Sequence, residues 1–63
     1  MNNDILDINE ASEYLRIKKR TLYSLVSRGI VPGIKVGGQW RFKRDVLEEW
    51  LDAEMRKSPS LNA

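Results

Sequence analysis

The sequence predicts one small, mostly helical α+β domain, in which two helices, a β-hairpin and a third helix follow one another. Apolar residues recur with helical spacing in three segments, and a glycine pair separates two short runs of alternating apolar and polar residues. A chain of 63 residues without internal repeats has room for one such domain.

The first predicted helix covers about residues 10–15. Residues 5–8, which precede it, are mostly apolar and indicate a short strand or a hydrophobic staple. We expect Asn9 to cap this helix, because its side chain can accept a hydrogen bond from a free backbone N–H group. Ala11 and Leu15 are four residues apart and therefore lie on one face.

The second predicted helix covers about residues 19–28 and follows a tight turn at residues 16–18, which lack helical periodicity. Gly29 is expected to end it, since glycine readily adopts the left-handed conformation found just after a helix. Its apolar stripe consists of Leu22, Leu25 and Val26.

Residues 34–36 and 40–42 are predicted to be the strands of a hairpin. A two-residue loop would place the apolar residues of the two strands on opposite faces of the hairpin. A three-residue loop pairs Val36 with Trp40 and gathers all the apolar side chains on one face. We therefore predict the three-residue loop, with the second inward pair formed by Ile34 and Phe42.

This register places Lys35 opposite Arg41 on the other face of the hairpin. Like charges that face each other across strands are destabilising, and an anion bound against them would relieve the repulsion. Trp40 shares the predicted apolar face, so we interpret it as a core residue rather than a platform for stacked bases.

The third predicted helix covers about residues 44–56. The predicted organisation is a flexible N-terminus at residues 1–4, one domain at 5–56 and a flexible tail or linker at 57–63. The apolar face of the third helix consists of Val46, Leu47, Trp50 and Leu51.

Charge is distributed unevenly along the chain, although the net charge is only +2. The first 15 residues contain four acidic residues and no basic ones, and residues 16–44 contain nine basic residues and no acidic ones. The remaining residues contain five acidic and two basic ones. A basic middle segment predicts a polyanionic partner, and the alternative interpretation is a solvated charged surface.

Composition excludes several kinds of chemistry. The chain has no Cys and no His, which excludes disulfides, thiolate nucleophiles and the common zinc ligands. We therefore expect no catalysis, no metal and no cofactor. No apolar run is long enough to span a membrane, and the acidic N-terminus does not resemble a signal peptide, so we expect a soluble, cytoplasmic protein without a membrane partner.

Two helices joined by a short turn and followed by a hairpin form the outline of a winged helix-turn-helix. Residues 5–52 resemble the excisionase-type, MerR-like DNA-binding domains. One departure is Lys18, where that family often has a small polar cap such as Ser. The resemblance is carried by INEASEYL at 8–15, IKKRTLY at 17–23, RGIVP at 28–32, VGGQWRF at 36–42 and DVLEEWL at 45–51.

The resemblance implies that the second helix enters the major groove of DNA while the hairpin, or wing, reaches a neighbouring minor groove. Arg20 lies opposite the apolar stripe, and its planar guanidinium suits a bidentate contact to guanine. By the same resemblance, Arg41 contacts the DNA backbone. The predicted DNA-binding residues are Lys18, Lys19, Arg20, Thr21, Tyr23, Ser24, Ser27, Arg28, Lys35, Gly37, Gly38, Gln39, Arg41, Lys43 and Arg44.

The predicted function is sequence-specific binding of double-stranded DNA as an excisionase-like recombination directionality factor. Its partners would then include a recombinase or integrase, or further copies of the chain bound cooperatively. One alternative is a small transcriptional regulator, and another is the N-terminal DNA-binding module of a longer protein. A third alternative is a module that binds an acidic protein instead of DNA.

Overall fold

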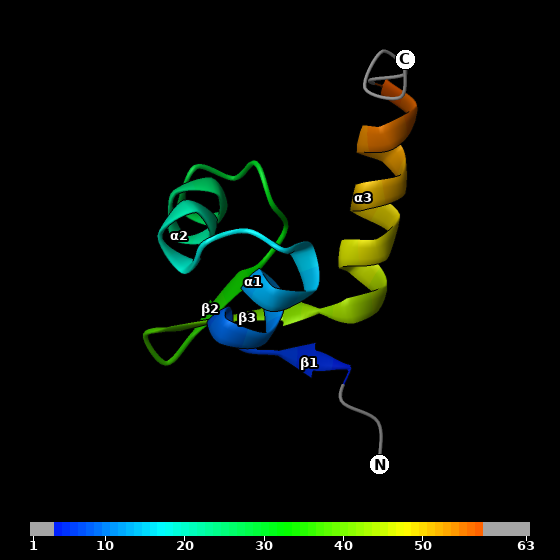
Figure 1. The fold of residues 1–63 in the computed structure, drawn as a ribbon. Coiled ribbons are helices and arrows are strands. Elements are labelled where there is room, and N and C mark those ends of the chain that lie inside the picture. The colour runs from blue at the N-terminus through cyan, green and yellow to red at the C-terminus, as the bar shows by residue number, and fades with distance from the viewer. Residues whose placement is uncertain (1–3, 58–63) are drawn as a thin grey trace.

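The computed structural model describes residues 4–57, and within them the helices and strands follow the predicted order (Figure 1). The three strands form an antiparallel sheet in the order β1-β3-β2, and the fold is a mostly helical winged helix-turn-helix. Residues 1–3 of the predicted flexible N-terminus and residues 58–63 of the predicted tail lie outside the described residues. The elements are β1 (Ile5–Leu6), α1 (Ile8–Leu15), α2 (Lys19–Ser27), β2 (Ile34–Val36), β3 (Gln39–Lys43) and α3 (Arg44–Lys57).

The cap of α1 differs from the prediction, because Asp7 and not Asn9 begins the helix. The Asp7 carboxylate accepts a hydrogen bond from the Glu10 backbone N–H at 2.8 Å, and the Glu10 carboxylate accepts one from the Asp7 N–H at 3.0 Å. This reciprocal capping box satisfies two backbone donors, whereas a single Asn cap would satisfy one. The helix therefore begins two residues earlier than predicted.

The turn between α1 and α2 is confirmed, and it depends on a left-handed residue. Arg16 has φ 60°, and its N–H donates to the Glu13 carbonyl at 3.2 Å. The N–H of Ile17 donates to the Ser12 carbonyl at 3.0 Å. A position of this kind usually holds Gly, and an L-residue there costs about 1 kcal/mol.

Gly29 ends α2 as predicted. It has φ 77°, and its N–H donates to the Val26 carbonyl at 3.1 Å. The N–H of Ile30 donates to the Leu25 carbonyl at 2.9 Å, which completes a Schellman motif. At the other end, Lys18 occupies the N-cap position without a side-chain hydrogen bond, as its departure from the family pattern suggests.

The predicted hairpin register is wrong. Val36 pairs with Gln39, so the loop contains only Gly37 and Gly38. Both glycines have positive φ values, 56° and 84°, as a two-residue turn that follows the twist of the strands requires. Ile34 consequently pairs with Arg41 on the outer face of the sheet, and the predicted pairs with Trp40 and Phe42 do not form.

The inner face of the sheet explains why this register is preferred. Phe42 and Trp40 already cover that face, and β2 contributes no apolar side chain to it. A Cβ atom added to Gly33 would lie 2.8 Å from both the Phe42 ring and a methyl group of Val26. Lys35 pairs with Trp40 instead of Arg41, and its ammonium group lies 5.6 Å from the centre of the Trp40 ring. The predicted like-charge pair is thus replaced by a cation–π contact.

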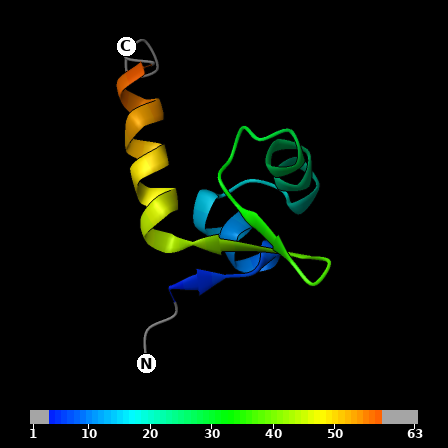
Figure 2. The same ribbon diagram turned by 180° about the vertical axis from the view of Figure 1, so that it is seen from behind.

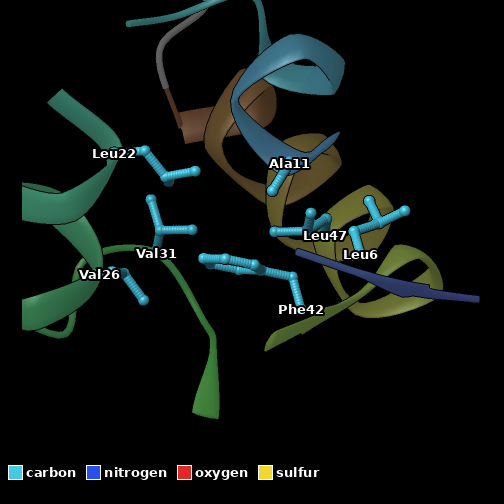
Figure 3. Close-up of a cluster of buried hydrophobic side chains, with 7 residues drawn as sticks. All are labelled: Leu6, Ala11, Leu22, Val26, Val31, Phe42 and Leu47. Carbon is cyan, nitrogen blue, oxygen red and sulfur yellow. The ribbon is translucent and has the colours of Figure 1, made fainter. Parts of the chain in front are cut away.

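The core lies between the inner face of the sheet and the helices. Phe42 projects from β3 toward Val31 and the α2 residue Val26, as Figure 3 shows. Trp40 and Trp50 are half-buried against this cluster, in agreement with their interpretation as core residues. The fully buried apolar residues are Leu6, Ala11, Leu22, Val26, Val31, Phe42 and Leu47.

α3 is less buried than its apolar pattern predicts. Leu47 is fully buried, but Val46 and Leu51 are 42% and 36% exposed. The helix starts directly after β3 and stands apart from α1 and α2 along much of its length (Figures 1 and 2). Its first turns therefore close the core, while its far half carries apolar side chains that residues 4–57 leave partly exposed. No helix within residues 4–57 is both long and apolar enough to cross a membrane.

Gly33→Ala is expected to lower the free energy of unfolding by about 1–3 kcal/mol, because the new methyl group collides with the Phe42 ring and Val26. Urea denaturation followed by circular dichroism measures the loss. Ile34→Ala is the matched control, since Ile34 is 65% exposed, and it should change stability by less than about 0.5 kcal/mol. Equal stability of Gly33→Ala and the parent chain would contradict the packing described above.

Arg16→Gly is expected to raise the free energy of unfolding by about 0.5–1 kcal/mol, because glycine adopts the left-handed conformation without strain. Arg28→Gly is the matched control. It removes the same charge at the C-cap of α2, where the φ of Arg28 is −90°. It should destabilise the fold, because glycine there adds only unfolded-state entropy. Opposite shifts of the thermal unfolding midpoint are the expected result, and shifts in the same direction would contradict it.

Candidate nucleic-acid interface

The outer face of α2 is polar and exposed. The helix directs Leu22 and Val26 into the core, which leaves Arg20, Ser24 and Ser27 on its exposed side. The Ser27 hydroxyl donates to the Ser24 carbonyl at 3.1 Å. Arg28, which follows the helix, donates to the Ser24 hydroxyl at 3.4 Å. The two serine side chains are short, so Arg20 is the longest side chain on this face of the helix.

Cations gather at the N-terminal end of α2. Lys18, Lys19 and Arg20 are all exposed there, and the first turn contains no acidic residue. The N-terminus of a helix carries a partial positive charge, so acidic residues are usually favoured at this end. Here the first turn is basic instead, and a bound anion would relieve the repulsion between these cations and the helix terminus. Thr21 is also exposed, one residue further along the helix.

The wing, formed by β2, β3 and their loop, carries a second group of polar residues. Arg41 donates one hydrogen bond to the Gln39 side-chain oxygen at 2.7 Å and another to the Trp40 carbonyl at 2.9 Å. These two bonds hold the guanidinium along the strand. Gly37 and Gly38 form the tip, where the absence of side chains exposes the backbone.

A polar cleft of about 300 Å³ joins α2 to the wing. Tyr23, which is 47% exposed, lines it from α2, while Gln39 and Arg41 line it from the wing. The start of α1 forms the third wall through Asp7 and Asn9. Two separately predicted surfaces, the helix and the wing, are therefore parts of one concave surface.

The structure does not bring two of the predicted residues to this surface. Lys43 ends β3, four residues beyond Gln39, and at about 3.4 Å per residue it lies roughly 14 Å along the strand from Gln39. Arg44 is half-buried, and its guanidinium lies 5.9 Å from the centre of the Tyr14 ring. Its backbone N–H donates to the Asp4 carbonyl at 2.7 Å, so Arg44 connects α3 to the strand β1 and to α1.

Asn9 is a polar residue of the cleft that sequence reasoning did not include in the site. Its predicted capping role is taken by Asp7, which leaves the Asn9 side chain exposed in the first turn of α1. A sequence signal existed, because Asp7 and Glu10 have the spacing of a capping box. Had Asp7 been predicted as the cap, Asn9 would not have been assigned to capping.

Comparison with known proteins assigns the chain at the level of its fold. A family model described as a helix-turn-helix domain matches residues 5–55, from β1 to the last turn of α3. No curated protein and no solved structure matches the sequence. The match includes α2 and the wing, which border the polar cleft.

Proposed function

The chain belongs to the family of helix-turn-helix domains, and on that premise we propose that it binds double-stranded DNA of defined sequence. α2 lies in the major groove and the wing reaches the adjacent minor groove. The observation that carries this proposal is the cleft shared by α2 and the wing, with Arg41 on its wing side. The start of the same helix bears the exposed cations Lys18, Lys19 and Arg20. DNA is the partner that the family implies, and its phosphates match the sign of this surface.

Sequence is proposed to be recognised mainly through α2. The major groove admits an α-helix, and the donor and acceptor pattern of its base edges is unique for each base pair. Arg20 in the first turn of α2 is the proposed reader of a guanine, because its fork matches the O6 and N7 acceptors. Thr21 and Ser24 are short, so their hydroxyls contact bases or phosphates only where the helix approaches closely.

The wing is proposed to contact the DNA backbone. Gly37 and Gly38 at its tip permit close approach of the main chain to the minor groove. The two hydrogen bonds that hold Arg41 orient its guanidinium before DNA arrives, which reduces the entropy lost on binding. Lys35 lies on the inner face of the wing, with its ammonium 5.6 Å from the centre of the Trp40 ring.

We assign phosphate contacts to five cations besides Arg20, three at the two ends of α2 and two on the wing. Asp7 in the wall at α1 bears a carboxylate, so the phosphates are expected along the α2 and wing sides. The predicted phosphate contacts of Lys43 and Arg44 remain predictions from the sequence, because Lys43 lies at the far end of β3 and Arg44 packs beside Tyr14. The five assigned cations are Lys18, Lys19, Arg28, Lys35 and Arg41.

Within this function we propose an excisionase-like role, in which the chain acts on DNA by binding and directs a recombinase rather than catalysing a reaction. The resemblance of residues 5–52 to excisionase-type, MerR-like domains supports this role. A recombinase or integrase gene beside the gene for this chain would favour it, and a promoter as the bound site would favour transcriptional regulation instead.

DNA affinity is expected to fall steeply with salt. Neutralising about five phosphates gives a slope of roughly −4 to −5 in a plot of log K against log salt concentration, because each contact releases condensed counterions. Fluorescence anisotropy with a labelled duplex that contains the selected site measures this slope. A flat salt response would exclude the proposed DNA contacts.

Arg20→Ala is expected to relax base preference at one position by about 1–3 kcal/mol, because the bidentate contact to guanine is lost. Arg41→Ala should instead weaken binding nearly uniformly on all sequences, since a phosphate contact carries no base information. Arg56→Ala is the control, because Arg56 lies in the last turn of α3. Affinity measurements on a library of single-base variants separate the three outcomes, and a uniform loss for Arg20→Ala would reassign Arg20 to a phosphate.

A further inference from the structure

The outer face of the sheet holds an apolar groove that shares only Arg41 with the proposed DNA contacts. It has a volume of about 400 Å³ and is lined by Ile5, Pro32, Ile34 and Val46 among others. Ile5 and Ile34 are 53% and 65% exposed. Because the inner face of the sheet packs on α1 and α2, this groove opens on the side of the molecule away from α2.

Two cations border the groove. Lys43 pairs with Ile5 across the strands, and Arg41 pairs with Ile34, so the side chains of each pair leave the sheet on the same outer face. Both cations line the groove. The groove thus combines an apolar floor with a basic border.

The far half of α3 carries the complementary combination. Leu51 and Met55 are 36% and 47% exposed, and Glu48 and Asp52 are exposed beside them. Residues three and four apart on a helix are neighbours, so these four side chains form one continuous patch, which we call the α3 patch. Neither carboxylate forms an ion pair with any residue in the described part of the chain, 4–57.

We propose that the α3 patch of one copy of this chain docks into the outer-face groove of a second copy. The apolar pair Leu51 and Met55 then covers the aliphatic floor, and the carboxylates Glu48 and Asp52 face the basic border. Opposite charges that meet around a small apolar centre are the arrangement that orients a weak protein contact.

The geometry requires a second copy rather than the same chain. Val46, at the start of α3, lines the groove, and Met55 lies nine residues further along a continuous helix. At 1.5 Å per residue this places Met55 about 14 Å away along the helix axis. Figure 1 shows the far half of α3 and the strand β1 at opposite ends of the molecule.

Charge also selects the head-to-tail arrangement over a symmetric one. Pairing two α3 patches would bring Glu48 and Asp52 of each copy together, and pairing two grooves would bring Lys43 and Arg41 together. Both symmetric contacts place like charges side by side, whereas patch-to-groove docking pairs opposite charges. A head-to-tail contact does not close on itself, so further copies can add at either end.

The test uses the full chain without DNA, so its result is independent of the proposed function. Sedimentation equilibrium is run up to roughly millimolar protein, because contacts of this small size bind weakly. The expected result is an average mass that rises above 7.3 kDa with concentration and does not level off at twice that value. A constant 7.3 kDa over this range would overturn the proposal.

Two variants test which surfaces meet. Ile34→Glu blocks the groove and leaves the α3 patch intact, while Met55→Glu blocks the patch and leaves the groove intact. Each variant alone is expected to stay monomeric, and an equimolar mixture is expected to form a dimer that grows no further. Symmetric pairing predicts that the mixture contains no such mixed dimer, so its absence would overturn the head-to-tail arrangement.

Matched controls separate docking from general effects of added charge. Val36→Glu places a carboxylate on the same outer face but outside the groove, and Glu49→Ala alters α3 outside the patch. Both should associate like the parent chain. All four substituted side chains are exposed, so circular dichroism should show parent-like folding for each variant. Loss of association in Val36→Glu, which adds the same negative charge as the two blocking variants, would attribute the effect to net charge. Loss in Glu49→Ala would place the contact outside the α3 patch, and either result would overturn the proposed surfaces.

Discussion

The contact between the Phe42 ring and the backbone at Gly33 is the constraint on which the rest of this structure depends. β2 approaches the core only because Gly33 has no side chain, and the ring fills that space together with Val26 of α2. Phe42 of β3 thus packs at once against Gly33, which leads into β2, and against the second helix. This packing holds α2 and the wing in their relative positions.

That position matters because the two basic surfaces would otherwise be independent. Residues 16–44 hold nine basic side chains, but a linear run of charge does not state which of them face the same way. Packing on Phe42 places Tyr23 opposite Gln39 and Arg41 across one cleft. Lys43 lies farther along β3, beyond the cleft, and lines the outer-face groove together with Arg41. The basic segment is therefore divided between two surfaces.

α3 shows how a small chain uses one element for two purposes. Its first turns complete the core through Leu47, and a core this small has no further surface to cover the helix. The remaining turns extend outward with Leu51 and Met55 exposed. Apolar periodicity predicted a buried face over the whole of α3. That prediction is correct only where the sheet lies against the helix. The rest of that face is available to another molecule.

The sequence by itself determined the element order, the turn at residues 16–18 and the end of α2 at Gly29, because local backbone preferences decide these features. It also identified Leu22, Val26 and Phe42 as core residues, since their spacing matches one buried face. Only the tertiary structure decided the hairpin register, the exposure of Ile34 and the separation of Lys43 from the cleft. These features depend on which faces of the sheet are already covered by residues distant in sequence. In the hairpin, the preference for a two-residue glycine turn outweighed the gain from gathering apolar side chains on one face.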